Sequence, residues 1–328
     1  MTVPVNVSIP TFNSSKFIVD ALNSIIKQSV KVESINVCDD FSDDDTCLIV
    51  EKWRKNHPEI ELNIIRNEKN LGYGGNLDVC LNNCSSQYLQ ILHADDILKE
   101  MAIANSYNKF LEYPELALVG GQEEYVDRNL KIVNSAKSGH EMFFNKGEIY
   151  EFVSETAHYI PVSSVMLNAE KAKEIGKFNL NNLSYDEFFW LRTLYKYPIL
   201  IQGTAQISRR LHGENLMHKW FYHRKDDFLK AIKFFITETP NLEKRADKRI
   251  LLIKYQKERY VRLLLGCAGS VIKKFRSSET AFFYLKEACK LSPLSAISNL
   301  SFWKISALVL LNTTHLYNLF FKLKLKKG

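Results

Sequence analysis

The feature that most constrains the fold is a regular alternation, over the first third of the chain, of short apolar runs with stretches of helical periodicity. Residues 3–9 alternate Val, Val, Val and Ile with smaller or polar side chains, which predicts a strand with one face more deeply buried. Apolar residues at helical spacing follow at 17–26, after three good N-cap residues at 13–15. Further strands are predicted at 35–38, 62–65 and 88–92, with helical stretches at 48–53 and 77–81. This order predicts an α/β fold with a mostly parallel sheet flanked by helices.

The rest of the chain is less regular and then becomes helical. Strands are predicted at 116–119 and 163–167, and a helix at 186–195. Helical periodicity also covers much of 228–265. We therefore expect one Rossmann-like domain at residues 1–216 and a helical region at 217–328.

Charge separates these two parts of the chain. Residues 217–328 hold 23 Lys and Arg against 8 Asp and Glu, whereas residues 1–216 hold 21 against 29. A basic segment with interleaved aromatic residues attracts phospholipid headgroups or nucleic acid. No known nucleic-acid-binding motif accompanies the charge, so no nucleic-acid partner is expected.

The cysteines and the first residues both favour a cytoplasmic protein. Residues 1–9 read as a strand and not as a secretory leader. The six cysteines form no CxxC pair or dense framework, which is typical of free thiols in a reducing compartment. They are Cys38, Cys47, Cys80, Cys84, Cys267 and Cys289.

Two adjacent carboxylates, Asp95 and Asp96, follow the strand predicted at 88–92. In open sheets of this class, ligands bind beyond the carboxyl ends of the strands. Carboxylate oxygens suit the hard cations Mg²⁺ and Mn²⁺. The alternative is an Asp pair that caps the helix beginning near Lys99.

An acidic loop, Asp39-Asp40 followed by three more Asp residues at 43–45, comes after the strand at 35–38. One carboxylate there can accept hydrogen bonds from the base or ribose of a nucleotide. We assign this role to Asp40, and we expect residues 43–45 to cap the next helix.

A glycine-rich turn at 72–76 lies between a predicted strand and a helix, where its backbone N–H groups can approach a ligand. It is not a dinucleotide fingerprint, because Leu77 stands where the third glycine of that pattern is required.

These motifs occur in a familiar order. VSIPTFN at 7–13, the Asp39-Asp40 loop, the turn at 72–76 and the ADD string at 94–96 together resemble family 2 glycosyltransferases, which have the GT-A fold. The resemblance covers roughly residues 3–215. It implies a nucleotide-binding half at about 1–116 and an acceptor half at about 117–216.

The resemblance also implies roles for single residues on the donor side. Asp40 would bind uracil or another base, Asp95 would approach the ribose, and Asp96 would hold Mn²⁺ or Mg²⁺ against the diphosphate. His93 stands where many relatives have the first acid of a DxD motif. The implied nucleotide-sugar site comprises Pro10, Thr11, Asn13, Asp40, Gly74 and Asp95.

Downstream, the segment 186–192 resembles the family's acceptor-site helix, in which an Asp is followed by Trp four residues later and Arg six residues later. The resemblance makes Asp186 the general base, with Glu187 as the reserve candidate. Trp190 and Arg192 would lie on the acceptor side. The alternative for Asp186 is a helix N-cap.

The string at 209–215 resembles the family's terminal His motif, and His212 would bind the cation or a phosphate oxygen. A zinc site made of His212, His218 and His223 matches no known metal spacing.

The apolar and aromatic segment 302–321 is interrupted by polar residues, so it is marginal as a spanning helix. We expect it to lie in the surface of an anionic membrane with the terminal lysines on headgroups. The alternative is a helix that packs on the catalytic domain. Membrane contact would suit an enzyme on the inner face of the cell membrane.

Together these expectations describe an inverting, metal-dependent transferase that uses a nucleotide sugar, chiefly a UDP-sugar, and a saccharide or lipid-linked acceptor. Bacterial cell-surface polysaccharide or lipid-linked oligosaccharide synthesis would be its context. Two alternatives are a nucleotidyltransferase and a non-catalytic nucleotide-sugar-binding module.

Overall fold

The computed structural model describes residues 1–135, 139–157, 159–178, 185–212 and 224–313. The chain forms two compact units. The first comprises Met1–Gly213 with Leu242–Lys244, and the second Glu214–Asn241 with Arg245–Gly328. The expected boundary at residue 216 lies outside the described residues, so that division stays a prediction, as does the one near residue 116.

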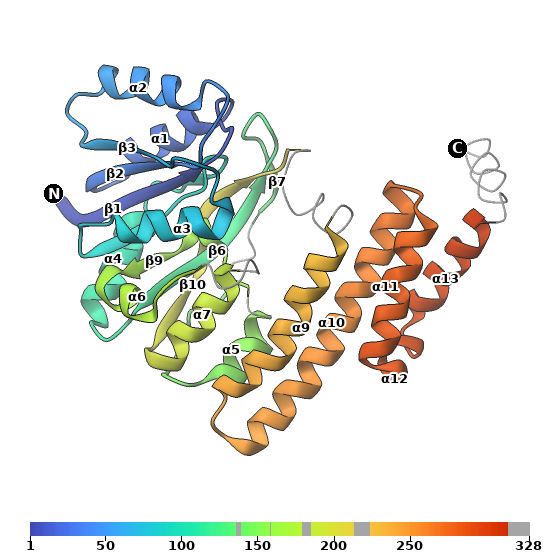
Figure 1. Cartoon of the computed structure of the whole chain (residues 1–328). Helices are drawn as coiled ribbons and strands as arrows, with labels where there is room; N and C mark the ends of the chain where they lie inside the picture. The colour runs from blue at the N-terminus through green and yellow to red at the C-terminus, as the bar shows by residue number, and fades with distance from the viewer. Residues whose placement is uncertain (136–138, 158, 179–184, 213–223, 314–328) are drawn as a thin grey trace. The chain divides into compact units, whose positions relative to one another are not determined.

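A mixed, mostly parallel sheet forms the centre of the first unit (Figure 1). The strand order is β3-β2-β1-β4-β9-β6-β10-β5, with β7 beside β6 and β8 beside β10. Strands β1 to β4 are parallel to one another, and β9 enters antiparallel between β4 and β6. The strands are β1 (Thr2–Thr11), β2 (Lys31–Asp39), β3 (Leu62–Arg66), β4 (Tyr88–Ile91), β5 (Ile97–Leu98), β6 (Leu118–Val126), β7 (Ile132–Asn134), β8 (Met142–Phe144), β9 (Met166–Asn168) and β10 (Ile199–Arg210).

Helices connect these strands, which confirms the predicted α/β class. Helix α3 packs against β1 and β2, α6 packs against α3 and α7, and α1 packs against α2. The helical elements are α1 (Ile18–Ile26), α2 (Thr46–Asn56), α3 (Gly72–Asn82), α4 (Ala102–Glu112), α5 (Ile149–Thr156), the 3-10 turn η1 (Val162–Ser164), α6 (Ala169–Ile175) and α7 (Tyr185–Lys196).

From Val5 onward strand β1 is buried on both faces, so the prediction of one more deeply buried face holds only for its first residues. The valine and isoleucine side chains of β1 are at most 1% exposed, and the alternate residues Asn6 and Ser8 are fully buried as well. The polar face is satisfied internally, because Asn6 Nδ2 donates to Ser34 Oγ and Ser8 Oγ donates to Asn6 Oδ1, each over 2.7 Å. An interior strand between β2 and β4 with helices on both sides has no solvated face.

Three other local predictions also need correction. Helix α1 has Phe17 as its N-cap without a side-chain bond, so the caps expected at residues 13–15 are wrong. Helix α3 begins at Gly72 and not near Leu77, because the Gly72 N–H is bound by a carboxylate. The strand expected at 163–167 begins only at Met166, after the turn η1. The N-cap of α2 is Asp45, which makes no side-chain cap bond, but the preceding Asp44 accepts the Thr46 N–H on its Oδ1 over 3.0 Å.

The second unit is helical, as predicted. In it α10 packs against α11 and α13, and the buried side chains include Leu264, Ala268 and Tyr284. Among the described residues, no helix combines the length and the apolar character needed to cross a bilayer. Its helices are α9 (Lys225–Leu242), α10 (Ala246–Lys274), α11 (Ser278–Leu291), α12 (Pro293–Ile297) and α13 (Leu300–Thr313).

Candidate active site

The carboxyl ends of β1, β2, β3 and β4 meet at one edge of the sheet because these strands are parallel. Thr11 pairs with Asp39 in the register of β1 and β2, and Asp39 pairs with Arg66 in that of β2 and β3. Beyond the strands, the Asp40 N–H donates to Thr11 O over 2.8 Å and the Asn67 N–H to Asp39 O over 2.9 Å. The residues expected to bind the donor therefore lie together where ligands bind in such sheets.

Asp40 is buried, and its carboxylate fixes the loop that leads into α3. Oδ1 accepts the Leu71 N–H over 2.7 Å and Asn67 Nδ2 over 2.9 Å, and Oδ2 accepts the Gly72 N–H over 2.9 Å. A carboxylate has about four acceptor positions. One position therefore remains for a ligand, and the contact with a base stays a prediction.

We expect Asp40→Asn to lower the free energy of unfolding by about 2 kcal/mol, because an amide loses the charge and turns an N–H toward donors. Urea unfolding of the variant and of the wild type measures this difference. Asp43→Asn, the same change at an exposed neighbour, is the control. Equal midpoints for Asp40→Asn and Asp43→Asn would show that the carboxylate does not fix the loop.

Pro10 and Thr11 close β1 and are both buried. Thr11 Oγ1 is a buried oxygen with no hydrogen-bond partner among the described residues. Buried polar atoms in native proteins are nearly always paired, so this hydroxyl fits a ligand contact. Asn13, at φ 50°, ties β1 to the acidic loop through Asn13 N to Ser42 Oγ (2.9 Å) and Asp43 N to Asn13 Oδ1 (3.0 Å). Its contact with the donor stays a prediction.

Gly74 is buried in the first turn of α3, at the same edge of the sheet. N–H groups of a first helical turn lack partners within the helix and carry the positive end of its dipole. The Gly72 N–H is bound by Asp40 and by Asn70 Oδ1, both at 2.9 Å. Gly74 lies further into this turn, and its contact with the donor stays a prediction.

The residues after β4 form a cluster of metal-binding side chains. One nitrogen of His93 and one oxygen each of Asp95 and Asp96 lie within 4.8 Å of one another. His93 Nδ1 is 3.7 Å from Asp96 Oδ2, and Ser163 Oγ donates to the same oxygen over 2.6 Å. Imidazole nitrogen and carboxylate oxygen are both ligands of Mn²⁺-like cations, so this donor set fits a divalent ion.

The electrostatics of the cluster favour a bound cation. Burial and the neighbouring Asp95 charge raise the pKa of Asp96 to about 7, against the bonds from Ser163 and from the Arg210 N–H (3.3 Å). Burial acts to raise the pKa of Asp95, but the His212 hydrogen bond and the charges of both histidines lower it on balance. A positive ion beside the two carboxylates would offset both the burial and the mutual repulsion that raise the pKa of Asp96.

His212 lies beside the first carboxylate of the pair. Its Nε2 is 2.8 Å from Asp95 Oδ2, and its ring lies 4.7 Å from the Phe17 ring. Arg210 reinforces this corner by donating to Asp95 O (3.1 Å) and to Asp20 Oδ2 (2.8 Å). His212 as a metal ligand stays a prediction. Residues 213–215 of its motif, and His218 and His223 of the zinc alternative, lie outside the described residues.

Asp186 stands in the first turn of α7. Burial raises the pKa of its carboxyl, while backbone N–H groups and the charges of His93 and Arg209 act to lower it. The charges of His93 and Arg209 therefore act on the carboxyl at the start of α7. A carboxyl with a raised pKa suits a base that works near neutral pH. Glu187 follows in the same turn, partly buried.

Trp190 and Arg192 lie further along α7 and contact the protein interior. Trp190 is fully buried and packs edge-on to Phe178, with ring centroids 5.9 Å apart. Arg192 donates to the carbonyl of Ile175, the last residue of α6 (2.9 Å), and to that of Lys177 just beyond it (2.5 Å). These contacts favour a role in positioning α7, and a contact with the acceptor stays a prediction.

Residues 6–176 match the sequence model of glycosyl transferase family 2. The chain belongs to this family. It is 26% identical over 231 residues to a chondroitin synthase of Escherichia coli, an alignment that covers 70% of this chain but only 32% of that protein.

Solved structures confirm the GT-A fold of this family 2 glycosyltransferase. Residues 1–349 of Staphylococcus aureus TarS in complex with UDP-GlcNAc match at a TM-score of 0.68 and 17% identity, over 97% of this chain and 91% of that one. Mannosyltransferase PcManGT from Pyrobaculum calidifontis in complex with GDP-Man and Mn²⁺ matches at a TM-score of 0.55 and 17% identity. The match covers 95% of this chain and 86% of that one.

The structure adds residues that sequence reasoning missed. His93 joins the carboxylates, and Tyr73 contacts its ring at 3.0 Å. Phe12 and Phe41 are each about half exposed at the donor edge, and aromatic rings there can stack on a base. Composition does not distinguish such exposed rings from core residues, but a His in place of the family's first acid was a visible signal.

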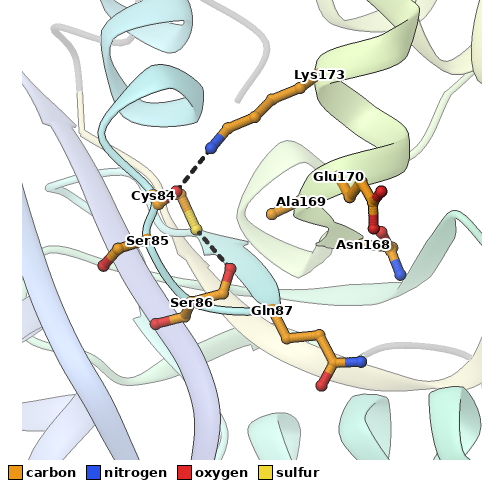
Figure 2. Close-up of a pocket in the computed structure, with 8 residues that line it drawn as sticks. All are labelled: Cys84, Ser85, Ser86, Gln87, Asn168, Ala169, Glu170 and Lys173. Carbon is orange, nitrogen blue, oxygen red and sulfur yellow. Dashed lines mark hydrogen bonds between the residues drawn. The ribbon is translucent and has the colours of Figure 1, made fainter.

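A cavity of about 370 Å³ lies at the opposite edge of the sheet, before β4 begins and after β9 ends (Figure 2). Lys173 Nζ donates to Cys84 O there over 2.8 Å. None of the candidate site residues lines it, so it is separate from the active site. Its lining residues are Cys84, Ser85, Ser86, Gln87, Asn168, Ala169, Glu170 and Lys173.

Proposed function

We propose that this family 2 glycosyltransferase is a metal-dependent, inverting enzyme that moves a sugar from a nucleotide diphosphate sugar, chiefly a UDP-sugar, to an acceptor hydroxyl. The observation that carries the proposal is the cluster of His93, Asp95 and Asp96, together with Asp186, on whose carboxyl the charge of His93 acts. Two carboxylate groups in separate environments suit two roles, cation binding and proton removal.

In this proposal the edge of the sheet binds the donor. Thr11 Oγ1 and the free acceptor position of Asp40 contact the base, Asp95 contacts the ribose, and the first turn of α3 faces the phosphates. Asp96, together with either Asp95 or His93, holds Mn²⁺ or Mg²⁺. When bound, this cation supplies positive charge to the departing diphosphate.

Asp186 acts on the acceptor. Its carboxylate removes the proton from the acceptor hydroxyl as that oxygen attacks the anomeric carbon from the face opposite the nucleotide. A single displacement inverts the anomeric centre. The acceptor side of the site is lined or positioned by Glu187, Trp190 and Arg192.

The comparisons support a UDP-sugar donor. The TarS structure holds UDP-GlcNAc, and the curated relatives include a chondroitin synthase. We propose a saccharide or lipid-linked saccharide acceptor in bacterial cell-surface polysaccharide or lipid-linked oligosaccharide synthesis. The chain spans about a third of the chondroitin synthase, so that protein's whole activity is not transferred.

A panel of nucleotide sugars tests the donor. We expect one UDP-sugar with Mn²⁺ to raise the melting temperature most, since a ligand at 100 times its Kd stabilises by about 2.7 kcal/mol. Chelator should remove the shift. If no nucleotide sugar stabilises the chain in the presence of either Mn²⁺ or Mg²⁺, the proposed donor site is wrong.

The family match favours sugar transfer over a nucleotidyltransferase. The remaining alternative is a module that binds a nucleotide sugar without turning it over. Such a module would need Asp40 and Asp96 but not Asp186. Donor hydrolysis that is present in the wild type and absent in Asp186→Asn supports the enzyme.

We also propose that the helical unit places the enzyme on an anionic membrane, on the inner face of the cell membrane. The segment 217–328 is basic, and Leu294, Leu300 and Trp303 of α12 and α13 are each more than half exposed. Apolar insertion combined with headgroup attraction is the usual basis of interfacial binding. Of the segment 302–321 that motivated this expectation, residues 314–321 lie outside the described residues.

We expect Leu294→Ser combined with Leu300→Ser to reduce flotation with phosphatidylglycerol liposomes by about tenfold or more, because two large apolar side chains leave the bilayer. The matched control makes the same changes at Leu48 and Leu111 of the first unit, which are also more than half exposed. Equal flotation of both double variants and the wild type would contradict membrane docking through α12 and α13.

A further inference from the structure

His93 presents one ring nitrogen to the cation cluster and the other to a tyrosine. Nδ1 lies 3.7 Å from Asp96 Oδ2, and Nε2 lies 3.0 Å from the Tyr73 hydroxyl. The two rings meet edge to face, with centroids 5.5 Å apart at 68°. The imidazole is thereby oriented with Nδ1 toward Asp96.

The hydroxyl of Ser163 contacts both His93 and Asp96. The His93 N–H donates to Ser163 Oγ over 3.1 Å, and Ser163 Oγ donates to Asp96 Oδ2 over 2.6 Å. Side chains fixed by such outer contacts lose little freedom when an ion binds. The His93 backbone and the Asp96 carboxylate are therefore held in a defined relation before a cation arrives.

The spacing of the ligand atoms suits one ion. Bonds of about 2.1 Å place ligands on opposite sides of a cation about 4.2 Å apart. The atoms of His93, Asp95 and Asp96 lie within 4.8 Å of one another. Small side-chain rotations are enough to bring all three to a common centre.

Tyr73 sets the protonation pattern that such binding requires. It stands in the first turn of α3, and its hydroxyl oxygen can accept the Nε2–H of His93. That tautomer leaves the lone pair of Nδ1 facing Asp96. Metal-binding histidines in proteins nearly always donate their second N–H to such a partner.

An imidazole in place of a carboxylate changes which ion the site prefers. Mg²⁺ favours oxygen ligands and binds nitrogen weakly, whereas affinity for nitrogen rises along the first-row transition ions from Mn²⁺ onward. A neutral ligand also lowers the negative charge that attracts a hard ion. A site with His93 should therefore discriminate against Mg²⁺ more than an all-carboxylate site.

We propose that His93, oriented by Tyr73, is a third ligand of the divalent cation and makes the site select Mn²⁺ over Mg²⁺. The inference rests on the proposed function, because the cation is that of the proposed donor site. It adds a ligand and an ion preference specific to this chain. Tyr73 acts through His93 and is a positioning residue.

Pulsed electron paramagnetic resonance on the full chain with MnCl₂ and UDP tests the ligand directly, because a coordinated imidazole ¹⁴N modulates the Mn²⁺ echo. We expect this modulation in the wild type and its loss in His93→Asp. It should persist in His212→Asn and in the exposed control His140→Ala. Modulation that survives in His93→Asp, or is lost only in His212→Asn, overturns the proposal.

Competition titrations of Mg²⁺ against Mn²⁺ test the preference. His93→Asp should shift the ratio of the two dissociation constants toward Mg²⁺ by about tenfold or more. Tyr73→Phe should keep the ¹⁴N modulation but weaken Mn²⁺ binding by about tenfold, as removal of an outer partner does. An unchanged ion ratio in His93→Asp contradicts the selectivity.

The Asp96→Asn variant distinguishes a failure of the proposed donor site from a failure of the proposed role of His93. If Asp96→Asn still binds Mn²⁺ with wild-type affinity in the presence of UDP, the proposed donor site itself is wrong. If Asp96→Asn loses Mn²⁺ while His93→Asp changes neither the echo nor the ion ratio, only the role of His93 fails.

Discussion

Asp96→Ala is expected to reduce sugar transfer by about a thousandfold or more, since loss of one preorganised charge-stabilising group costs about 10²–10³ in kcat and here the cation leaves with it. Asp96 is the buried member of the cluster, and Ser163 and the Arg210 N–H fix both of its oxygens. Turnover with saturating Mn²⁺ and with chelator measures the effect. If Asp96→Ala keeps wild-type turnover in chelator, the metal-dependent mechanism is wrong.

Measurements of folding stability against pH distinguish a loss of activity at Asp96 from misfolding of the variant. Because the pKa of Asp96 is raised from its ordinary value of 3.8 to about 7, the native state keeps a proton that the unfolded state has released between these values. The stability of the metal-free wild type should therefore fall as pH rises from about 4 to about 7. Asp96→Asn has no such carboxyl, so in chelator it should melt higher than the wild type at pH 8 and near it at pH 4. Mn²⁺ with UDP should reverse that order at pH 8.

Asp186→Asn is expected to lower kcat by about 10²–10⁴-fold, the usual contribution of a general base. The affinity for UDP with Mn²⁺ should change little, because the residue acts on the acceptor. Asp43→Asn, the same substitution at an exposed aspartate, is the control and should keep wild-type kcat.

The pH profile gives a second readout for Asp186. A base acts in its ionised form, so kcat/KM should fall as pH drops through the pKa of Asp186. Burial raises that pKa, and the fall should occur above the ordinary range of an aspartate. If Glu187→Gln instead removes the acidic limb and Asp186→Asn keeps it, Glu187 is the base.

The sequence predicted the fold well where periodicity is long and regular. The β-α order of residues 3–92 gave the parallel half of the sheet, because alternating patterns of that kind have few other solutions. It was less informative about β1, because alternation with Asn6 and Ser8 resembles a half-solvated strand. Only the partner Ser34, distant in sequence, shows that the polar face is satisfied in the interior.

The donor edge was predictable because its residues follow consecutive parallel strands. The finer contacts of the site were not. Ser163 and Arg210 reach Asp96 from segments 67 and 114 residues away, and no local pattern reports such pairs. Arg192 illustrates the opposite problem, since a charged residue on a motif helix suggests a ligand contact but here binds backbone carbonyls.

The hydrogen bond from the Arg210 N–H to Asp96 Oδ1 joins the last residue of β10 to the segment after β4. Local opening that detaches the end of β10 would therefore release one oxygen of the buried carboxylate. A ligand that grips Asp96 should in turn slow amide hydrogen exchange at residue 210, far along the chain from the nucleotide-binding strands. Binding at the donor site would thus be detectable as slower local opening of β10, a strand in the predicted acceptor half of the unit.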